Sequence, residues 1–320
     1  MTLSLDSIPL GVFVAYIFIV GLMVGSFLNV VIYRLPKMLY QSWNDEAIAF
    51  LQAESTAQVA ETLTPVDENR PTFNLAYPPS RCGHCGHRLK WYENIPLVSW
   101  CLQKAKCRAC GGKISIRYPL VECLTGITSA YIAYRYGFSY QTAAAFLLNA
   151  VLICAFWIDW DTQLLPDDLM LPLIWAGLII NYLGVGFVPF SEAFWGAISG
   201  YLILWSVYWL FYLCFKKEGM GYGDFKLLSA LGAWLGWLAL PSILLIASLS
   251  GLLYGGVRAL TGFRSPSEQV EAETASTQES KEAEEGHQWS RPLPFGPFLI
   301  VGGWIVWMAY PEAAHLFLHP

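Results

Sequence analysis

The amino-terminal part of the chain contains the segment IPLGVFVAYIFIVGLMVGSFLNVVI, residues 8–32, in which no residue is charged. A helix needs about 20 apolar residues to cross the hydrocarbon core of a bilayer, so this segment predicts a first transmembrane helix. The residues before it include Asp6 but no lysine or arginine, and no small-residue cleavage site follows it. We therefore expect the segment to remain in the protein as a membrane helix and not to be removed as a signal peptide.

The composition of the whole chain agrees with a membrane protein. Of the 320 residues, 55% are hydrophobic and 13% are charged, whereas soluble globular proteins carry about 25% charged residues. The formal net charge is -5, and the mean hydropathy is +0.44. This composition excludes a cytosolic enzyme, a disordered protein and a nucleic-acid binder with a basic tail.

Further apolar helices are expected after residue 117. One apolar run, 227–257, is too long for a single ordinary span, and Pro241 lies near its middle, so we divide it into two helices. The expected fold class is an α-helical polytopic membrane protein with about eight transmembrane helices. The runs that predict the helices after the first are 118–134, 136–158, 169–190, 193–215, 227–257 and 292–311.

The distribution of basic residues orients these helices. Residues 34–117 hold 11 of the 19 Lys and Arg residues, and cytoplasmic segments of membrane proteins are enriched in both. Eight helices threaded from this assumption leave only Arg135 outside and place both termini in the periplasm. The domains are then a first transmembrane helix at 1–33, a small cytoplasmic domain at 34–117 and a membrane domain of seven helices at 118–320. The last includes a loop at about 264–291, rich in Glu, Ser, Thr and Ala, which we expect to be a disordered cytoplasmic linker.

Four cysteines in the polar stretch form two matched pairs. Each pair has the spacing Cys-x-x-Cys with a glycine behind it, and 21 residues separate the pairs: Cys82, Cys85, Cys107 and Cys110. Two such turns can aim four thiolates at one point and complete a tetrahedral zinc site. Four thiolates leave no open coordination position, so the zinc is expected to be structural, in a zinc-ribbon-like domain. A redox-active pair is the alternative, but cytoplasmic thiols stay reduced, and two matched pairs favour zinc.

The other sulfur and imidazole groups are expected to have structural or solvent-exposed positions. His84 and His87 lie in or beside the first pair, but four cysteines suffice for zinc, so we expect both side chains to be solvent-exposed. Four cysteines outside the pairs are expected to be small buried apolar residues: Cys101, Cys123, Cys154 and Cys214.

Acidic residues are rare in the membrane half, and two groups of aspartates lie at its expected cytoplasmic edge. Four of them are in IDWDTQLLPDDL, residues 158–169: Asp159, Asp161, Asp167 and Asp168. The second location has a single aspartate, Asp224 in GYGDFK, residues 221–226. Two carboxyl groups close together cannot both ionise, so one can act as a general base while the other stays protonated. Such a pair could hydrolyse a peptide bond as aspartic proteases do. The glycines before Asp224 would allow unusual backbone conformations or the close approach of a substrate strand.

The aspartates also have structural alternatives. Asp167 and Asp168 follow Pro166 and open the next apolar run, where they would be natural helix N-caps. Asp161 could be a solvated loop residue, and a single G-x-G-D sequence arises by chance in many turns. A proton-coupled transporter with carboxylates in the membrane is the main competing function.

Together these motifs resemble the bacterial type IV prepilin peptidases, G-x-G-D aspartic membrane proteases that act as leader peptidase and N-methyltransferase. The resemblance covers nearly the whole chain. It implies that Asp159 and Asp224 are the catalytic pair, a choice that the residue types alone leave open. Besides the cysteine pairs and the aspartate segments, it rests on residues 25–36, 79–82, 92–100 and 116–122.

The resemblance also implies a reaction and its partners. Members of this family cut the basic leader from type IV prepilins and type II secretion pseudopilins at the cytoplasmic face of the inner membrane. They then methylate the new amino-terminal residue with S-adenosylmethionine. Such an enzyme contacts membrane lipid and no nucleic acid. The alternatives are an enzyme with peptidase activity only and a zinc-ribbon membrane scaffold that tolerates the loss of both aspartates.

The site for the methyl donor is poorly marked. No G-x-G-x-x-G sequence lies between an expected strand and an expected helix, so an ordinary Rossmann cofactor site is not visible. Candidates for the methyl-donor site are Glu93, Asn94, Pro96 and Trp100. A turn beside an interfacial aromatic residue explains the same residues equally well.

Overall fold

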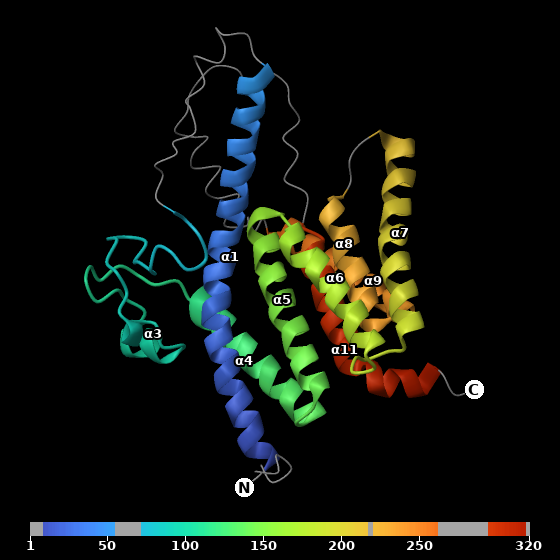
Figure 1. Ribbon diagram of the computed structural model, residues 1–320, viewed down its shortest axis with the longest axis horizontal. Helices are drawn as coiled ribbons and strands as arrows, with labels where there is room; N and C mark the ends of the chain where they lie inside the picture. Colours follow the sequence, from blue (N-terminus) through green and yellow to red (C-terminus); the bar gives the residue numbers. More distant parts are fainter. Residues whose placement is uncertain (1–8, 55–71, 217–219, 262–293, 318–320) are drawn as a thin grey trace. The chain divides into compact units, whose positions relative to one another are not determined.

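The computed structural model of the protein describes residues 9–54, 72–216, 220–261 and 294–317 (Figure 1). The chain divides into two compact units, Met1–Cys154 and Ala155–Pro320. Within the described ranges the protein is helical and contains no β-strand. It has only two isolated β-bridges, both in the segment that carries the cysteine pairs, residues 72–116, which we call the cysteine-rich segment. The expected α-helical class is therefore confirmed.

The first unit begins with α1 (Leu10–Glu54), a continuous helix of 45 residues. The sequence placed the end of this helix near residue 33, but the helix continues through Arg34 and Pro36. Pro36 removes one helical hydrogen bond, yet the Ala, Leu, Gln and Glu residues that follow are good helix formers and propagate the helix. At about 1.5 Å per residue, α1 is roughly 68 Å long, about twice the thickness of a hydrocarbon core.

Small residues let α4 (Arg117–Tyr136) pack closely against α1. At Gly21 an added Cβ would lie 2.9 Å from the Cα of Gly126, and at Gly25 it would lie 2.7 Å from the Cα of Glu122. Only glycine permits two backbones to approach this closely, as at small-x-x-x-small contacts between membrane helices. Packing between α1 and α4 therefore accounts for Gly21 and Gly25.

The helix α5 (Tyr140–Thr162) runs from the first unit into the second. It follows a turn at Gly137, whose φ of 61° favours glycine. In the first unit the buried side-chain amide of Asn149 donates to Oγ1 of Thr128 on α4 at 2.9 Å. The end of α5 belongs to the second unit and carries Asp159.

In the second unit α8 (Tyr222–Leu235) lies at the centre, in contact with four other helices. Apart from Lys226, every residue from Asp224 to Leu235 is buried, and a helix that is apolar on all sides is typical of such a position. Gly196 of α7 and Gly232 of α8 face each other so closely that a Cβ on either would collide with the other's carbonyl oxygen. The helices around α8 are α6 (Asp167–Tyr182), α7 (Phe190–Phe215), α9 (Leu240–Thr261) and α11 (Gly296–Phe317).

The long apolar run 227–257 is divided as expected. The helix α8 ends at Leu235, and Gly236 follows with a φ of 81°. A short 3-10 turn, Trp237–Ala239, leads into α9, whose second residue is Pro241. Proline is well tolerated in the first turn of a helix because the N–H that it lacks would have no helical partner there.

Four of the described helices are long and apolar enough to cross a membrane: Leu10–Ala53, Tyr140–Thr162, Phe190–Phe215 and Trp237–Thr261. These apolar helices indicate an integral membrane protein. The apolar helix Gly296–Ala309 is shorter, and α6 and α8 have 16 and 14 residues, so the expected eight spans go beyond what length and composition establish. The linker expected at 264–291 lies outside the described residues.

Candidate functional site

The two cysteine pairs form two turns of the same construction, 25 residues apart in the chain. In the first turn the N–H of Gly86 donates to the carbonyl of Cys82, and in the second the N–H of Gly111 donates to the carbonyl of Cys107, both at 2.9 Å. Both glycines have a φ of 71°, which residues with a Cβ rarely adopt. An isolated β-bridge closes each turn: Arg81 with Arg88, and Lys106 with Lys113.

The two turns bring four sulfur atoms to one place. Those of Cys82, Cys85, Cys107 and Cys110 all lie within 4.8 Å of one another. Zinc bonds to sulfur of about 2.3 Å put the sulfurs of a tetrahedral site roughly 3.8 Å apart, and the Sγ atoms of Cys82 and Cys110 are 3.9 Å apart. The N–H of Gly112 donates to Sγ of Cys110 at 3.4 Å. The donor set and its spacing therefore fit a metal site.

Backbone donors and neighbouring sulfurs set the pKa values of two of these thiols. The backbone N–H groups of Cys85 and His84 lower the pKa of Cys82 to about 6. At Cys85 the backbone N–H of His87 lowers the pKa, but desolvation and the hydrogen bonds to the other three sulfurs raise it to about 11. A metal cation attracted by the Cys82 thiolate would displace the protons of the other thiols when it binds.

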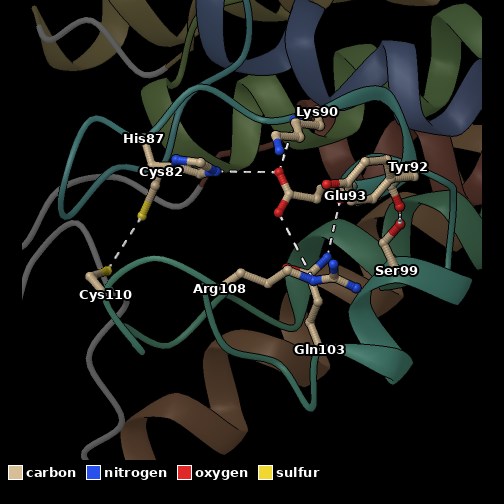
Figure 2. Close-up of polar contacts among 9 residues, drawn as sticks. All are labelled: Cys82, His87, Lys90, Tyr92, Glu93, Ser99, Gln103, Arg108 and Cys110. Carbon is tan, nitrogen blue, oxygen red and sulfur yellow. Dashed lines mark hydrogen bonds and ion pairs between the residues drawn. The ribbon is translucent and has the colours of Figure 1, made fainter.

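Glu93 connects the two turns (Figure 2). Its Oε2 atom lies 3.3 Å from Nε2 of His87 beside the first pair, and its Oε1 atom lies 4.0 Å from Nε of Arg108 within the second. The backbone N–H of Lys90 also donates to Oε2, at 2.9 Å. The Lys90 N–H, with His87 and Arg108, lowers the pKa of Glu93, so the carboxylate is ionised at neutral pH.

The two histidines differ in their surroundings. His84 is exposed, as expected. The His87 side chain is only 31% exposed, because its ring faces the buried carboxylate of Glu93. The expectation of a solvent-exposed His87 is therefore wrong, and the sequence offers no signal that pairs these two residues.

The cysteines outside the pairs are less buried than expected. Cys154 is buried, and Cys123 is half-buried, but Cys101 and Cys214 are exposed. Cys214 lies near the end of α7, an apolar helix with many exposed large hydrophobic residues. On a membrane protein an apolar side chain can face lipid, so apolar character does not by itself predict burial in the protein.

Two of the methyl-donor candidates stabilise the cysteine-rich segment. The carbonyl of Glu93 accepts a hydrogen bond from Nε2 of Gln103 at 3.4 Å, and Nε1 of Trp100 donates to the carbonyl of Ile114 at 3.3 Å. Asn94 is exposed. These contacts explain Glu93 and Trp100 without a ligand. Pro96 is half-buried, and binding of a methyl donor stays a prediction for all four candidates.

Two buried charged residues attach the cysteine-rich segment to the helices of the first unit. Arg34 on α1 donates to the carbonyls of Asn74 at 2.8 Å and Pro78 at 2.6 Å. Glu122 on α4 accepts a hydrogen bond from the N–H of Leu97 at 2.8 Å. Sequence reasoning assigned no contact to either charge. A charged residue within an apolar helix could have indicated a partner, because burying an unpaired charge costs free energy.

The second unit contains two buried aspartates. Asp159, near the end of α5, is 5% exposed, and Asp224, in the first turn of α8, is 7% exposed. The two carboxyl groups are close enough for the charge of Asp159 to act on Asp224. The Oδ2 atom of Asp159 is buried and makes no hydrogen bond to any residue that the structure describes. The structure thus brings together the two aspartates that the resemblance singled out, whose catalytic role stays a prediction.

The other aspartates of the segment 158–169 are exposed. Asp161, Asp167 and Asp168 all lie at the surface. The expectation that Asp167 or Asp168 caps α6 is wrong by one position, because the N-cap is Pro166 and both aspartates lie in the first turn. There their charges favour the helix through its dipole. Asp167 also forms an ion pair with Lys226 of α8.

The glycines of the GYGD sequence are in different surroundings. At Gly223 an added Cβ would lie 2.8 Å from Cβ of Leu165, whereas at Gly221 it would meet nothing within 4 Å. Gly223 is therefore required by the close approach of the loop after α5. Together with the ion pair of Asp167, this contact sets the first turn of α8 against that loop.

These sites and the fold define a helical membrane protein with a pair of buried carboxyl groups and a cluster of four thiols. Residues 19–136 match the Bacterial Peptidase A24 N-terminal domain, and residues 146–256 match the Type IV leader peptidase family. The chain belongs to this family, which confirms the resemblance seen in its motifs.

The curated relatives of the chain align with it over most of its length. It is 46% identical over 301 residues to the prepilin leader peptidase/N-methyltransferase of Stutzerimonas stutzeri, covering 94% of this chain and 92% of that protein. The protein of the same name from Aeromonas salmonicida is 46% identical over 290 residues, covering 90% and 88%. That of Pseudomonas aeruginosa is 44% identical over 301 residues, covering 94% and 91%. No solved structure gives a significant match.

Proposed function

We propose that the protein is a prepilin leader peptidase and N-methyltransferase. It would cleave the leader from type IV prepilins and type II secretion pseudopilins and methylate the new amino-terminal residue. Relatives of this name that align over most of the chain support both activities. The observation that carries the peptidase activity is the burial of Asp159 and Asp224 within range of each other's charge.

The carboxyl pair suits peptide hydrolysis by general acid–base catalysis. Because two neighbouring negative charges repel each other, the pair holds one proton between its members. The ionised member takes a proton from water, whose oxygen attacks the carbonyl carbon, while the protonated member donates to the carbonyl oxygen. The C–N bond then breaks, and the leaving amine takes up a proton. The products are the carboxylate of the leader and the free amine of the mature chain.

The proposed location is the inner membrane, with eight transmembrane helices, both termini in the periplasm and the carboxyl pair at the cytoplasmic edge. The 11 Lys and Arg residues of 34–117 support a cytoplasmic position for that segment. A substrate with a basic leader followed by an apolar helix would present its scissile bond at this edge. Membrane lipid is then a permanent partner of the protein.

A structural zinc ion held by Cys82, Cys85, Cys107 and Cys110 is part of the proposal. The sulfur spacing and the backbone donors support a metal at this point. Bound by four thiolates, zinc keeps no open position for a substrate, so it would stabilise the fold of the segment. It would hold together the two turns that Glu93 also connects.

S-adenosylmethionine is the proposed methyl donor. A methyl group would pass from the sulfonium to the unprotonated amine that cleavage has released, with loss of one proton. Glu93, Asn94 and Trp100 stay candidates for the donor site. Asn94 is the exposed member of this set, whereas Glu93 would have to exchange one of its contacts for the ligand.

One assay tests both activities. The full-length protein in detergent is incubated with a purified prepilin and S-adenosylmethionine, and the product is identified by intact mass. We expect a pilin that has lost its leader and gained one methyl group. Asp159→Asn and Asp224→Asn should abolish cleavage, keep the zinc content, and still methylate a pilin supplied without its leader. Asp161→Asn, at an exposed aspartate two residues away, is the matched control and should cleave normally.

The competing functions give different products in this assay. Cleavage without methylation indicates a peptidase only. Normal cleavage by Asp159→Asn or by Asp224→Asn would rule out the proposed mechanism. A transporter predicts proton-coupled flux across vesicles and no cleavage, and a membrane scaffold predicts neither activity and tolerates the loss of both aspartates.

A further inference from the structure

The beginning of α11 lies directly against the carboxyl group of Asp159. Gly296 is the first residue of this helix and is buried. An added Cβ at Gly296 would lie 3.1 Å from Cγ of Asp159, closer still to its Oδ2, and 3.2 Å from Cδ1 of Leu165. Position 296 therefore leaves no space for a side chain unless Asp159 or the helix moves.

The backbone of Gly296 also interacts with Asp159. The first N–H groups of a helix have no partner within the helix, and Pro297 has no N–H to offer. The N–H groups of Phe298 and Leu299 donate to the carbonyl of Phe295, both at 3.1 Å. The N–H of Gly296 lies close enough to the Asp159 carboxyl group to interact with it.

Aromatic packing fixes the start of α11 relative to Asp159. The ring of Phe298 packs against Tyr254 of α9, with centroids 5.7 Å apart. Tyr254 packs edge-on against Trp160, at 5.4 Å, and Trp160 is the next residue after Asp159. The first turn of α11 and the end of α5 are therefore held by one set of contacts within the second unit.

From this geometry we infer that Gly296 is a positioning residue of the carboxyl pair, which fixes the Asp159 carboxyl group by its backbone N–H and by its lack of a side chain. The inference rests on the proposed peptidase function. Gly296 acts through Asp159 and takes no part in the proton transfers. It adds a third segment, the first turn of α11, to a site that sequence motifs confine to α5 and α8.

A methyl group at position 296 would displace the Asp159 carboxyl group. Catalysis by acid–base pairs depends steeply on position, and a displacement of about 1 Å can cost about 100-fold in rate. The atoms that a Cβ at position 296 would meet belong to Asp159 and Leu165, so the change acts first on the carboxyl group. We therefore expect Gly296→Ala to lower kcat of leader cleavage by about 100-fold and to leave KM within about twofold.

The test compares three variants of the full-length protein with the wild type. Gly296→Ala is the test variant. Pro297→Ala changes the neighbouring residue but keeps the Gly296 backbone, and Gly256→Ala adds a methyl group on α9 where nothing lies within 4 Å. For each protein, kcat and KM of cleavage are measured, with the rate of methyl transfer to a pilin supplied without its leader. Only Gly296→Ala should lose cleavage, and all three should methylate normally.

The ratio of the two activities separates positioning from folding. If Gly296→Ala yields less folded protein, both rates fall by the loss of protein, but the ratio of cleavage to methyl transfer still drops about 100-fold under the inference. An unchanged ratio, or a rise in KM without a change in kcat, would overturn it. A wild-type protein that neither cleaves nor methylates would instead reject the proposed function.

Discussion

Lys226 and Asp167 form an ion pair that joins the amino-terminal part of α8 to the first residue of α6. Lys226 follows Asp224 by two residues, and Asp167 follows the loop that leads away from Asp159. The pair therefore connects the two segments that carry the buried aspartates. Its side chains are 26% and 56% exposed, so solvent screens the interaction.

The first prediction concerns this ion pair. Exposed pairs contribute about 0.2–1 kcal/mol, so Lys226→Met and Asp167→Asn should each lower the free energy of unfolding by less than about 1 kcal/mol. The double variant should lose less free energy of unfolding than the two single variants lose together. The difference, which is the coupling energy of the ion pair, should become smaller at high salt. Thermal unfolding in detergent measures this cycle, with Asp168→Asn as the control. Additive losses would mean that the pair does not stabilise the fold.

The second prediction concerns the thiol cluster. Cys107→Ser should remove one ligand of four and release most of the bound zinc, because a tetrahedral structural site tolerates no missing ligand well. Metal content per chain is measured by elemental analysis after purification. Cys101→Ser, which changes an exposed cysteine outside the cluster, should keep about one zinc per chain. Equal zinc in the two variants would contradict a four-cysteine site.

The third prediction concerns Glu93 and pH. Its pKa is lowered by the N–H of Lys90 and by His87 and Arg108, so its contribution to stability is present above the pKa of an unfolded glutamate. The contribution is lost as the pH falls through the folded pKa. Glu93→Gln should therefore weaken the cysteine-rich segment at neutral pH, and the difference from wild type should vanish in acid.

Amide hydrogen exchange of residues 80–115, compared between the two proteins at the same pH, measures this difference. His87→Asn removes a single partner of the carboxylate and should have a smaller effect than Glu93→Gln. A difference that stays constant from neutral to acid pH would show that the charge of Glu93 does not stabilise the segment.

The fourth prediction concerns the contact between α7 and α8. A Cβ at Gly232 would collide with the backbone of Gly196, and backbone atoms cannot yield as a side chain does. Gly232→Ala should destabilise the protein by about 3 kcal/mol or more. Gly256→Ala, with open space at its Cβ, should be neutral or stabilising by up to about 1 kcal/mol. The yield of folded protein and its unfolding temperature distinguish the two.

Several parts of the fold and site could be predicted because local sequence determines them. Each cysteine pair forms its own turn, so the spacing of Cys82 and Cys85 predicts the geometry of the four-thiol cluster directly. The division of 227–257 follows from helix length and from Pro241. The pairing of Asp159 with Asp224 could be predicted only with the family resemblance, since residue types alone also allowed Asp161 or Asp167.

Other features depend on contacts between distant segments and leave little trace in the sequence. The helical formers after Pro36 outweigh the proline, so α1 does not end where the charges begin. The position of Glu93 between His87 and Arg108 follows from the folding of both turns around it. Gly296 lies far from Asp159 in the chain, and an isolated glycine between phenylalanine and proline indicates a turn but not the residue that the turn approaches.

The matching construction of the two cysteine turns has a consequence for the exchange of the proposed zinc ion. Since each turn is closed by its own backbone hydrogen bonds, the proposed zinc ion would join two turns that form without it. A chelator should then remove the zinc without unfolding either turn. Added zinc should restore the cysteine-rich segment while the surrounding helices stay folded.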